Sequence, residues 1–388
     1  MAEGRRLDVL DGMRGIAILL VLWYHIWEIS WLPAPLAALQ FIPETGFVGV
    51  HLFFFISGFV IFYPFVRAKF EDRPAPSWGH FAYRRAIKIV PSYLLSLVIV
   101  FAIGYAHYSS FGAAIKPIVT HLLFIHTWFG DTYGSLNGVL WTLAVEVEFY
   151  VIFPLICWAF LRRPLVTFAV MVAIAIAWRV YASHCCFTGS FALMLENLPG
   201  YIDIFACGML ASYGFVRFRD RPTSRTIEVG ATLSAIAGFA ALLILMQNLW
   251  SVRTADQWSE VWQIYNRTLL GITFAVIGFA SLFAMSWWKR ALGNPILVFF
   301  SLISYNLYIY HQVIARELLT WHLPPYTTPN PRYDPHWQLL FSLIAFPATI
   351  AFAALITYGF ERPLLKLPGS WWSNRMSRFR KRRVLPDM

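Results

Sequence analysis

The chain alternates between long apolar stretches and short polar connections along almost its whole length. A helix that crosses the hydrocarbon core of a membrane needs roughly 20 mostly apolar residues. Stretches of about this length predict ten transmembrane helices, at residues 13–32, 46–66, 86–107, 137–160, 165–182, 198–216, 228–249, 266–287, 295–319 and 337–360. One further apolar stretch, 117–128, is too short to cross, and we expect a re-entrant or interfacial helix there.

The composition supports the same interpretation. Hydrophobic residues make up 59% of the 388 residues and charged residues only 13%, whereas a soluble domain usually carries about 25% charged residues. The sequence therefore predicts an all-α membrane protein, a bundle of ten transmembrane helices with a short re-entrant or interfacial helix. It predicts one transmembrane domain, 1–366, followed by a basic cytoplasmic tail, 367–388, that lies on anionic lipid headgroups.

The formal net charge of +11 would suggest a nucleic-acid partner in a soluble protein. Here the basic residues fall in short blocks between the apolar stretches, so membrane topology explains them better and no nucleic acid is expected. Basic-rich and basic-poor connections alternate, which places both ends of the chain in the cytoplasm. Counting 117–128 as a crossing would break this alternation. The basic-rich connections are 67–88, 162–163, 217–225 and 289–290.

Several common catalytic motifs are missing from the sequence. It has no G-x-S-x-G, H-E-x-x-H or G-x-x-x-x-G-K pattern, which disfavours a serine hydrolase, a zinc protease and an ATP-driven pump. The four cysteines form no C-x-x-C pair, so neither a zinc site nor a disulfide framework is expected. No metal is predicted, and the state of the adjacent Cys185 and Cys186 stays open.

Arg14 and His25 are unusual in the first predicted span, because ionisable side chains inside a membrane are costly. Their spacing puts them within about 20° of one helix face and about 16 Å apart along its axis. One face would thus carry a cation near the cytoplasm and an imidazole beyond the midplane. Alternatively, Arg14 only extends toward the lipid headgroups and His25 bonds to a neighbouring helix. Asp11, just before this span, is expected to cap the helix.

Glu146, in the fourth predicted span, should lie at the same membrane depth as His25. Counting at about 1.5 Å per residue puts Glu146 about 13 Å and His25 about 12 Å from the outer surface. A carboxylate beside an imidazole orients it and raises its basicity, so we expect the two to act together. Glu148 points about 200° away from Glu146, which favours a structural role for Glu148.

Other polar residues allow two interpretations each. Arg84, Arg85 and Lys88 open the third predicted span, where basic residues commonly serve topology alone but also suit phosphate groups. His51 and His311 lie near the outer surface, where a lone histidine is more often a satisfied interface residue than a catalyst. Ser57, followed by glycine, can simply permit close helix packing.

Taken in order, these segments resemble the acyltransferase-3 family of integral membrane acyltransferases. Each motif alone is weak, but together they cover nearly the whole chain and are quite specific. The segments that carry the resemblance are Leu7 to Ala17 with His25, Gly49 to Phe59, Arg84 to Tyr93, Trp141 to Tyr150, Ser304 to His311, and Glu361 to Pro363.

The resemblance implies a ten-span bundle that moves an acyl group, often acetyl, from cytoplasmic acyl-CoA to a carbohydrate or another hydroxyl acceptor. It links Arg14, His25 and Glu146 to activity. This chain has His51 where the family usually has aspartate, so no role is carried over to His51. Lys88 replaces a usual arginine, which keeps the charge but loses the fork-shaped donor. No fused esterase-like domain follows the last predicted span, so relatives that need one are expected to be poor models.

The sequence-based hypothesis is therefore a membrane O-acyltransferase, in the inner (plasma) membrane of a bacterium, with His25 as general base and Glu146 orienting it. Acetyl-CoA is the expected acyl-CoA donor, and the residues expected to hold its phosphates are Arg14, Arg85 and Lys88. The supporting residues are Asp11, Ser57, Trp141, Tyr305, His311 and Glu361. The expected partners are acyl-CoA, a carbohydrate or lipid-linked glycan acceptor, and membrane lipids.

Other functions stay open at this point. A transporter or flippase of a lipid-linked glycan would line its pathway with the same charges, and a non-catalytic membrane sensor is a third possibility. Direct transfer and a relay through an acylated residue are both compatible with the sequence. The acceptor, the acyl chain length and the oligomeric state are not determined.

Overall fold

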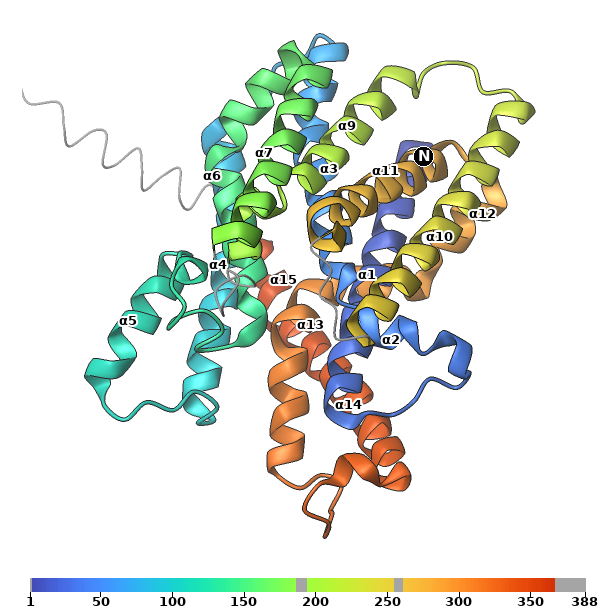
Figure 1. The fold of residues 1–388 in the computed structure, drawn as a ribbon. Helices are drawn as coiled ribbons and strands as arrows, with labels where there is room; N and C mark the ends of the chain where they lie inside the picture. Colours follow the sequence, from blue (N-terminus) through green and yellow to red (C-terminus); the bar gives the residue numbers. More distant parts are fainter. Residues whose placement is uncertain (1, 186–193, 255–260, 367–388) are drawn as a thin grey trace, which may run out of the picture.

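The computed structural model describes residues 2–185, 194–254 and 261–366, and within these ranges all regular structure is helical, as predicted (Figure 1). Cys186 and the tail, 367–388, lie outside the described residues. The long helices are α1 (Ala2–Ser30), α3 (Val48–Phe70), α4 (Trp78–Ala102), α6 (Trp141–Arg162), α7 (Pro164–Cys185), α9 (Ile202–Phe218), α10 (Arg225–Thr254), α11 (Arg267–Phe283), α13 (Pro295–Thr320) and α14 (Pro335–Ile356). The short ones are α2 (Phe41–Thr45), α5 (Phe111–Leu122), α12 (Ser286–Leu292) and α15 (Arg362–Leu365). Two π-helical turns, Trp262–Asn266 and Thr357–Glu361, precede α11 and α15.

Among the described residues, nine helices are long and apolar enough to cross a membrane, and they coincide with nine of the predicted spans. The remaining prediction, 198–216, coincides with α9, which has 17 residues. Helix α9 runs parallel to α3. At its beginning the ring of Tyr201 lies 5.3 Å from the ring of His51, and at its end Arg219 pairs with Glu71 just beyond α3. Helix α9 therefore accompanies α3 along most of its length.

The short apolar stretch predicted not to cross is a short helix, α5, of 12 residues. It begins earlier than predicted because Ser110 caps it, with the Ser110 Oγ accepting a hydrogen bond from the backbone N–H of Ala113 at 3.3 Å. Figure 1 shows α5 beside the bundle, next to the end of α4. Its Lys116 pairs with Asp131 at 2.6 Å.

The predicted cap at Asp11 is wrong. Helix α1 begins at Ala2, so Asp11 lies inside the helix rather than before it. The apolar stretch marks the part of the helix inside the membrane, but the helical hydrogen bonds continue into the polar residues that precede it. Asp11 instead joins α1 to α13, because its Oδ1 accepts a hydrogen bond from the Ser301 hydroxyl at 3.1 Å.

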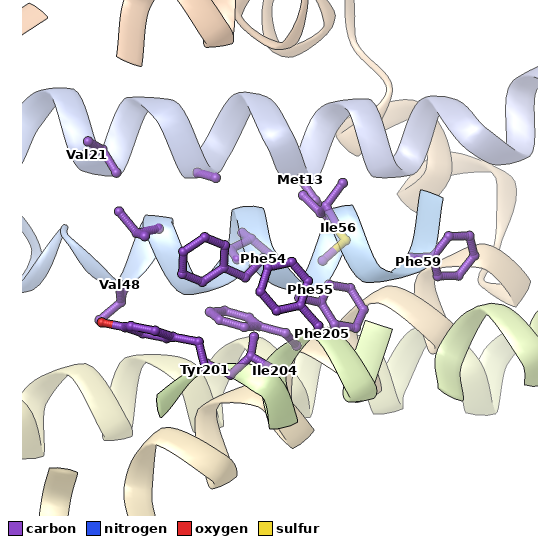
Figure 2. Close-up of a cluster of buried hydrophobic side chains, with 14 of the residues drawn as sticks. Met13, Val21, Val48, Phe54, Phe55, Ile56, Phe59, Tyr201, Ile204 and Phe205 are labelled. Carbon is purple, nitrogen blue, oxygen red and sulfur yellow. The ribbon is translucent and has the colours of Figure 1, made fainter. Parts of the chain in front are cut away.

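Helix α3 packs between α1 and α9 in the centre of the bundle, and Figure 2 shows the aromatic and aliphatic side chains between them. Two glycines permit the close approach of α3 and α9. A Cβ on Gly58 would lie 2.2 Å from the carbonyl oxygen of Phe205, and a Cβ on Gly208 would lie 2.0 Å from that of Phe55. Lipid chains are as apolar as leucine, so helices in a membrane associate largely through such close packing. The glycine that follows Ser57 therefore does permit close helix packing, which was one of the two interpretations of this position.

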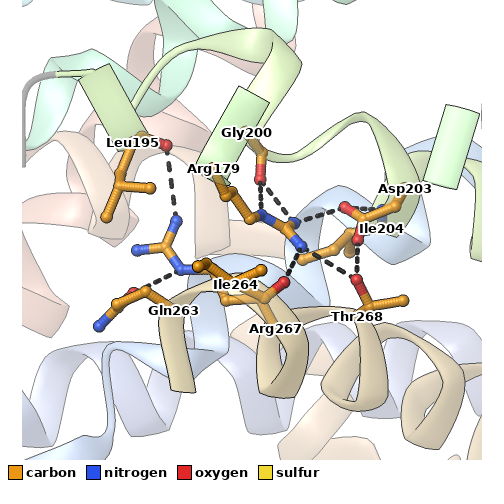
Figure 3. Close-up of polar contacts among 9 residues, drawn as sticks. All are labelled: Arg179, Leu195, Gly200, Asp203, Ile204, Gln263, Ile264, Arg267 and Thr268. Atoms are coloured by element: carbon orange, nitrogen blue, oxygen red, sulfur yellow. Dashed lines mark hydrogen bonds and ion pairs between the residues drawn. The ribbon is translucent and has the colours of Figure 1, made fainter. Parts of the chain in front are cut away.

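A fully buried ion pair ties α7 and α9 to α11 (Figure 3). The Arg179 guanidinium donates to Asp203 at 2.7 Å and to the carbonyl oxygen of Gly200 at 2.6 Å. The Thr268 hydroxyl donates to the other oxygen of Asp203 at 2.6 Å. A buried ion pair is stable only when its remaining hydrogen-bonding atoms also have partners. Because the atoms of this pair have such partners, we interpret it as a structural contact that holds the three helices together.

Candidate active site

Two polar pockets occupy opposite halves of the bundle, and they meet at a shared wall. The first, here called the proximal pocket, lies toward the beginning of α1 and has a volume of about 130 Å³. The second, the distal pocket, lies toward the end of α1 and has a volume of about 400 Å³. Val50 of α3 and Tyr308 of α13 line both of them. The arrangement divides the predicted site residues into two groups.

The proximal pocket gathers the three predicted phosphate-binding residues. Arg14 comes from α1, and Arg85 and Lys88 come from the first half of α4. The Arg85 guanidinium lies 6.0 Å from the ring of Tyr150, and its buried Nε has no hydrogen-bond partner among the described residues. Three cations on one concave wall form a site suited to an anionic ligand.

Lys88 is fixed in this pocket by Glu361 and Tyr305. The Lys88 ammonium forms an ion pair with Glu361 and lies 5.3 Å from the ring of Tyr305. Glu361, at the end of a π-helical turn, also accepts a hydrogen bond from Asn306 at 2.6 Å. The Tyr305 hydroxyl donates to the carbonyl oxygen of Ile89 at 2.7 Å. Two predicted supporting residues thus hold the π-helical turn after α14 and the middle of α13 against α4.

Glu146 also faces the proximal pocket, and its predicted pairing with His25 is wrong. Its Oε1 accepts hydrogen bonds from Ser57 at 2.6 Å and from Tyr150 at 2.5 Å. Glu146 lines the proximal pocket but not the distal pocket, which His25 lines. Equal depth in a membrane fixes a position along the normal but not the direction in which a side chain points.

His25 instead pairs with His311 at the distal pocket. The Nδ1 of His25 lies 3.0 Å from the Nε2 of His311 and 3.0 Å from the carbonyl oxygen of Val21. The Nδ1 of His311 lies 2.9 Å from the carbonyl oxygen of Leu307. A carbonyl only accepts, so the proton of neutral His311 belongs on its Nδ1, and its Nε2 is an acceptor. The Nδ1 of His25 then carries a proton toward two acceptors, and its Nε2 keeps a free lone pair.

The remaining predicted residues lie around the distal pocket or away from both pockets. Trp141, the first residue of α6, lines the distal pocket with its ring 5.6 Å from that of Tyr201. His51 lines the same pocket, and neither of its ring nitrogens has a partner among the described residues. Glu148 accepts a hydrogen bond from the indole N–H of Trp128 at 2.6 Å, so the expectation that it points away from Glu146 is confirmed.

Five charged or amide side chains of the distal pocket were not predicted as site residues from the sequence. They are Glu196, Arg253, Arg267, Gln312 and Arg316. Most lie at the ends of predicted spans, where topology alone explains a charge. Arg267 could have been found, because it falls inside the predicted span 266–287, and a charged residue at such a position marks a functional site by default.

Comparison with known proteins assigns the chain to a family. The family model for the acyltransferase domain, Acyl_transf_3, matches residues 7–358. The chain belongs to the acyltransferase-3 family. The resemblance noted from the motifs is therefore confirmed over nearly the whole chain, and with it an integral membrane protein.

The relatives of this acyltransferase-3 chain are distant. O-acetyltransferase OatA of Staphylococcus aureus, strain NCTC 8325, is 24% identical over 337 residues, which are 81% of this chain and 51% of the relative. A putative O-acetyltransferase of Staphylococcus aureus, strain COL, is 21% identical over 380 residues, which are 93% of this chain and 58% of the relative. The chain thus spans little more than half the length of these relatives. No solved structure matches it.

Proposed function

We propose that this chain is a membrane O-acyltransferase that takes an acyl group from acyl-CoA at the cytoplasmic face and transfers it to a hydroxyl group on the opposite side. One observation carries the proposal. A pocket lined by cations and a pocket lined by a histidine with a free lone pair meet inside the bundle, at Val50 and Tyr308. A donor with a phosphorylated end and a reactive thioester end can reach from the first pocket toward the second.

The proximal pocket is the proposed donor site. Arg14, Arg85 and Lys88 would pair with the phosphates of acyl-CoA, through charge-assisted hydrogen bonds. Small-molecule sites usually have volumes of about 300–1,000 Å³, so a pocket of about 130 Å³ is too small for a nucleotide. The proximal pocket would instead take the narrow pantetheine part of acyl-CoA, which ends in the thioester. The nucleotide part would then stay at the mouth of the pocket, and the small volume favours acetyl as the acyl group.

In the proposed reaction, the Nε2 of His25 accepts the proton of the acceptor hydroxyl. The hydroxyl oxygen attacks the thioester carbonyl carbon, the carbon–sulfur bond breaks, and the departing thiolate takes up a proton. The products are an ester and free CoA, and no oxidant or metal is consumed. A positioned base of this kind contributes about 10²- to 10⁴-fold to a rate. His311 would act through His25, because its Nε2, together with the carbonyl oxygen of Val21, accepts from the Nδ1 of His25 and holds the tautomer and orientation that leave Nε2 free.

Glu146 has a different proposed role from the one inferred by depth. It binds the Ser57 and Tyr150 hydroxyls on the wall of the donor pocket. It would therefore hold α3 and α6 in place around the thioester arm. Glu146 and His25 lie on opposite sides of the shared wall. This placement is compatible with a role of Glu146 in donor binding and a role of His25 in proton transfer.

The proposed topology has ten crossings and places both ends of the chain in the cytoplasm. The tenth crossing would be α9, which runs alongside the candidate span α3. Residues 1–366 would form the transmembrane domain and residues 367–388 a basic cytoplasmic tail on anionic lipid headgroups. Since both relatives are bacterial, the proposed location is a bacterial plasma membrane. The relatives are named O-acetyltransferases, which suggests an acceptor with a hydroxyl group. The proposed acceptor is a glycan.

The test is release of CoA from acetyl-CoA by the purified protein in the presence of a glycan acceptor. We expect CoA and an acetylated glycan in equal amounts, the latter measured by mass spectrometry, and neither product from the His25→Ala variant. Movement of a lipid-linked glycan across proteoliposomes with no CoA release would contradict the proposal and would instead favour a transporter.

A further inference from the structure

The distal pocket carries more positive charge than proton transfer to His25 requires. Arg253, Arg267 and Arg316 reach it from α10, α11 and α13. Glu196, between α7 and α9, is the one acidic side chain on the described part of its wall. A pocket that binds a neutral sugar has no need of three guanidinium groups, so the excess charge calls for a ligand of opposite sign.

Arg267 is the strongest observation, because its charge is buried without an ion pair. Its side chain is only 6% exposed. Its Nε donates to the side-chain oxygen of Gln263 at 2.7 Å, and its Nη1 lies 3.5 Å from the carbonyl oxygen of Leu195. Its guanidinium lies 5.0 Å from the centre of the Tyr201 ring. All of these partners are neutral, and a buried charge is normally paired because desolvation is otherwise costly.

The neighbouring Arg179 shows what a neutralised arginine looks like in the same region. Figure 3 shows the Arg179 guanidinium bonded to Asp203, while Arg267 bonds only to Gln263 and Leu195. Asp203 is already used by Arg179 and Thr268. No acidic oxygen of the described residues lies within 4.0 Å of the Arg267 guanidinium. The charge of Arg267 is therefore available to a ligand in the distal pocket.

Glu196 does not cancel this charge. One of its carboxylate oxygens is buried and has no partner among the described residues, and the carboxyl does not form an ion pair with Arg267. Burial raises the pKa of Glu196 to about 7, although the charge of Arg267 acts in the opposite direction. With a pKa of about 7, this carboxyl is protonated in about half of the molecules at neutral pH, and in that form it can donate a hydrogen bond to an anion. His51, with both ring nitrogens unpartnered, offers another hydrogen bond in the same pocket.

We propose that the distal pocket binds an acceptor that carries an anionic oxygen group, a carboxylate or a phosphate, and that Arg267 is the residue that pairs with it. Arg316, which is exposed on the wall of the same pocket, would attract and help to hold the anion. The acceptor would thus be an acidic sugar unit, acylated on a hydroxyl group near its acidic group. This inference names the acceptor class of the proposed transferase, and it rests on that proposed function.

The test compares ligands that differ only in the acidic group. Methyl glucuronide, methyl glucoside and methyl glucoside 6-phosphate share one ring, and a single sugar unit is in keeping with a pocket of about 400 Å³. Binding to the full-length protein in detergent is measured by calorimetry without acetyl-CoA. We expect at least one anionic sugar to bind about tenfold or more tightly than methyl glucoside, as one charged hydrogen bond would give. The two anionic sugars distinguish a carboxylate from a phosphate acceptor.

Two variants test the residues, with one matched control. Arg267→Gln should lower the affinity for the anionic sugar to that for methyl glucoside, and Arg316→Gln should lower it in part. Because Arg316 is exposed, the Arg316→Gln variant should fold, and it tests the inference if the Arg267→Gln variant does not fold. Arg332→Gln is the control, because Arg332 stacks on Trp31 outside the distal pocket, and it should keep the full preference.

Equal affinity for all three sugars, absence of binding by both anionic sugars, or an unchanged preference in a folded Arg267→Gln or Arg316→Gln variant would each overturn the inference. Failure of the proposed function gives a different result. In that case the anionic sugar binds and depends on Arg267, but no CoA is released when acetyl-CoA is added. CoA release with methyl glucoside as the better acceptor would leave the transferase standing and reject the anionic acceptor.

Discussion

His25 and His311 lie 3.0 Å apart, from the Nδ1 of the first to the Nε2 of the second, across the contact between α1 and α13. The chain of hydrogen bonds ends on the carbonyl oxygen of Leu307, one turn before His311. Because a backbone carbonyl cannot donate, the order of donors and acceptors along this chain has a fixed direction. The direction leaves the lone pair on the Nε2 of His25, and His25 lines the distal pocket.

The first prediction concerns His311, which should matter through its Nε2 acceptor. His311→Leu should lower kcat by about 10- to 100-fold, by analogy with the loss when the orienting partner of a metal-bound histidine is removed. His311→Gln should recover much of this loss, because the side-chain oxygen of glutamine can accept the same hydrogen bond. The measurement is CoA release under saturating acetyl-CoA and acceptor.

The two variants separate a positioning role from a structural one. A purely structural histidine would be replaced better by leucine than by glutamine, since this site is fully buried. If both variants keep normal kcat, His311 has no role in orienting His25. Thermal unfolding of both variants in detergent controls for loss of fold.

The sequence allowed a good prediction of the fold because membrane helices are marked by local composition. Nine predicted spans coincide with long apolar helices, and the short stretch that was not counted as a crossing is the short helix α5. The predicted beginning of α1 was too late, because hydropathy reports where the membrane begins rather than where helical hydrogen bonds begin. That difference also misplaced Asp11.

The site could be predicted only in part, because its members lie on separate helices. The periodicity of α1 predicts Arg14 and His25 on one helix face, and in the structure Arg14 lines the proximal pocket and His25 the distal pocket. The partner of His25 depends on the packing of α1 against α13, and no property of either segment alone encodes that contact. The position of Arg267 inside a predicted span can be read from the sequence, but its lack of an acidic partner cannot, because its contact with Leu195 joins segments that are far apart in the chain.

The second prediction concerns Lys88 in the proximal pocket. Lys88→Gln should raise KM for acetyl-CoA about tenfold or more with little change in kcat, because a lost phosphate contact weakens donor binding in the ground state and the transition state alike. Lys88→Arg should retain much of the affinity, since it keeps the charge. Initial rates over a range of acetyl-CoA concentrations give both constants.

Removal of Lys88 alone would leave Glu361 buried without its ion-pair partner, so the double variant Lys88→Gln/Glu361→Gln serves as a neutral replacement of the pair. Lys116→Gln is the matched control. Lys116, an exposed residue of α5, forms an ion pair with Asp131 and does not line the proximal pocket. An unchanged KM in both the single and the double variant would exclude Lys88 from donor binding.

The third prediction concerns the packing of α3 against α9. Gly208→Ala should destabilise the protein by about 1–3 kcal/mol, because the added methyl group would overlap the backbone of α3 at Phe55 and Phe59. Gly230→Ala on α10 is the control, since a Cβ there meets nothing within 4 Å and alanine favours a helix over glycine. Thermal unfolding in detergent should show a lower Tm for the first variant only. Equal Tm values would mean that α3 and α9 are not closely packed.

The last prediction concerns Glu71, which joins the end of α3 to the end of α9. Its carboxylate pairs with Arg67 at 2.8 Å and with Arg219. The hydrogen bond from Arg67, followed by that from Arg219, lowers the pKa of Glu71 to about 2. A carboxyl whose pKa is lower in the folded state than in the unfolded state stabilises the fold above its unfolded pKa of about 4.3. That stabilisation is lost as the pH falls toward 2.

The Tm of the wild-type protein should therefore exceed that of Glu71→Gln at pH 6–8, and the difference should shrink steadily below about pH 4.5, as the linkage relation requires. Asp72→Asn is the matched control. It removes one negative charge at the next position, where the positive φ of 50° is one that asparagine tolerates. The Asp72→Asn variant should unfold close to the wild type at every pH. If Glu71→Gln behaves in the same way, the ion pairs of Glu71 do not hold the ends of α3 and α9 together, and the alignment of α9 with α3 must depend on the glycine contacts alone.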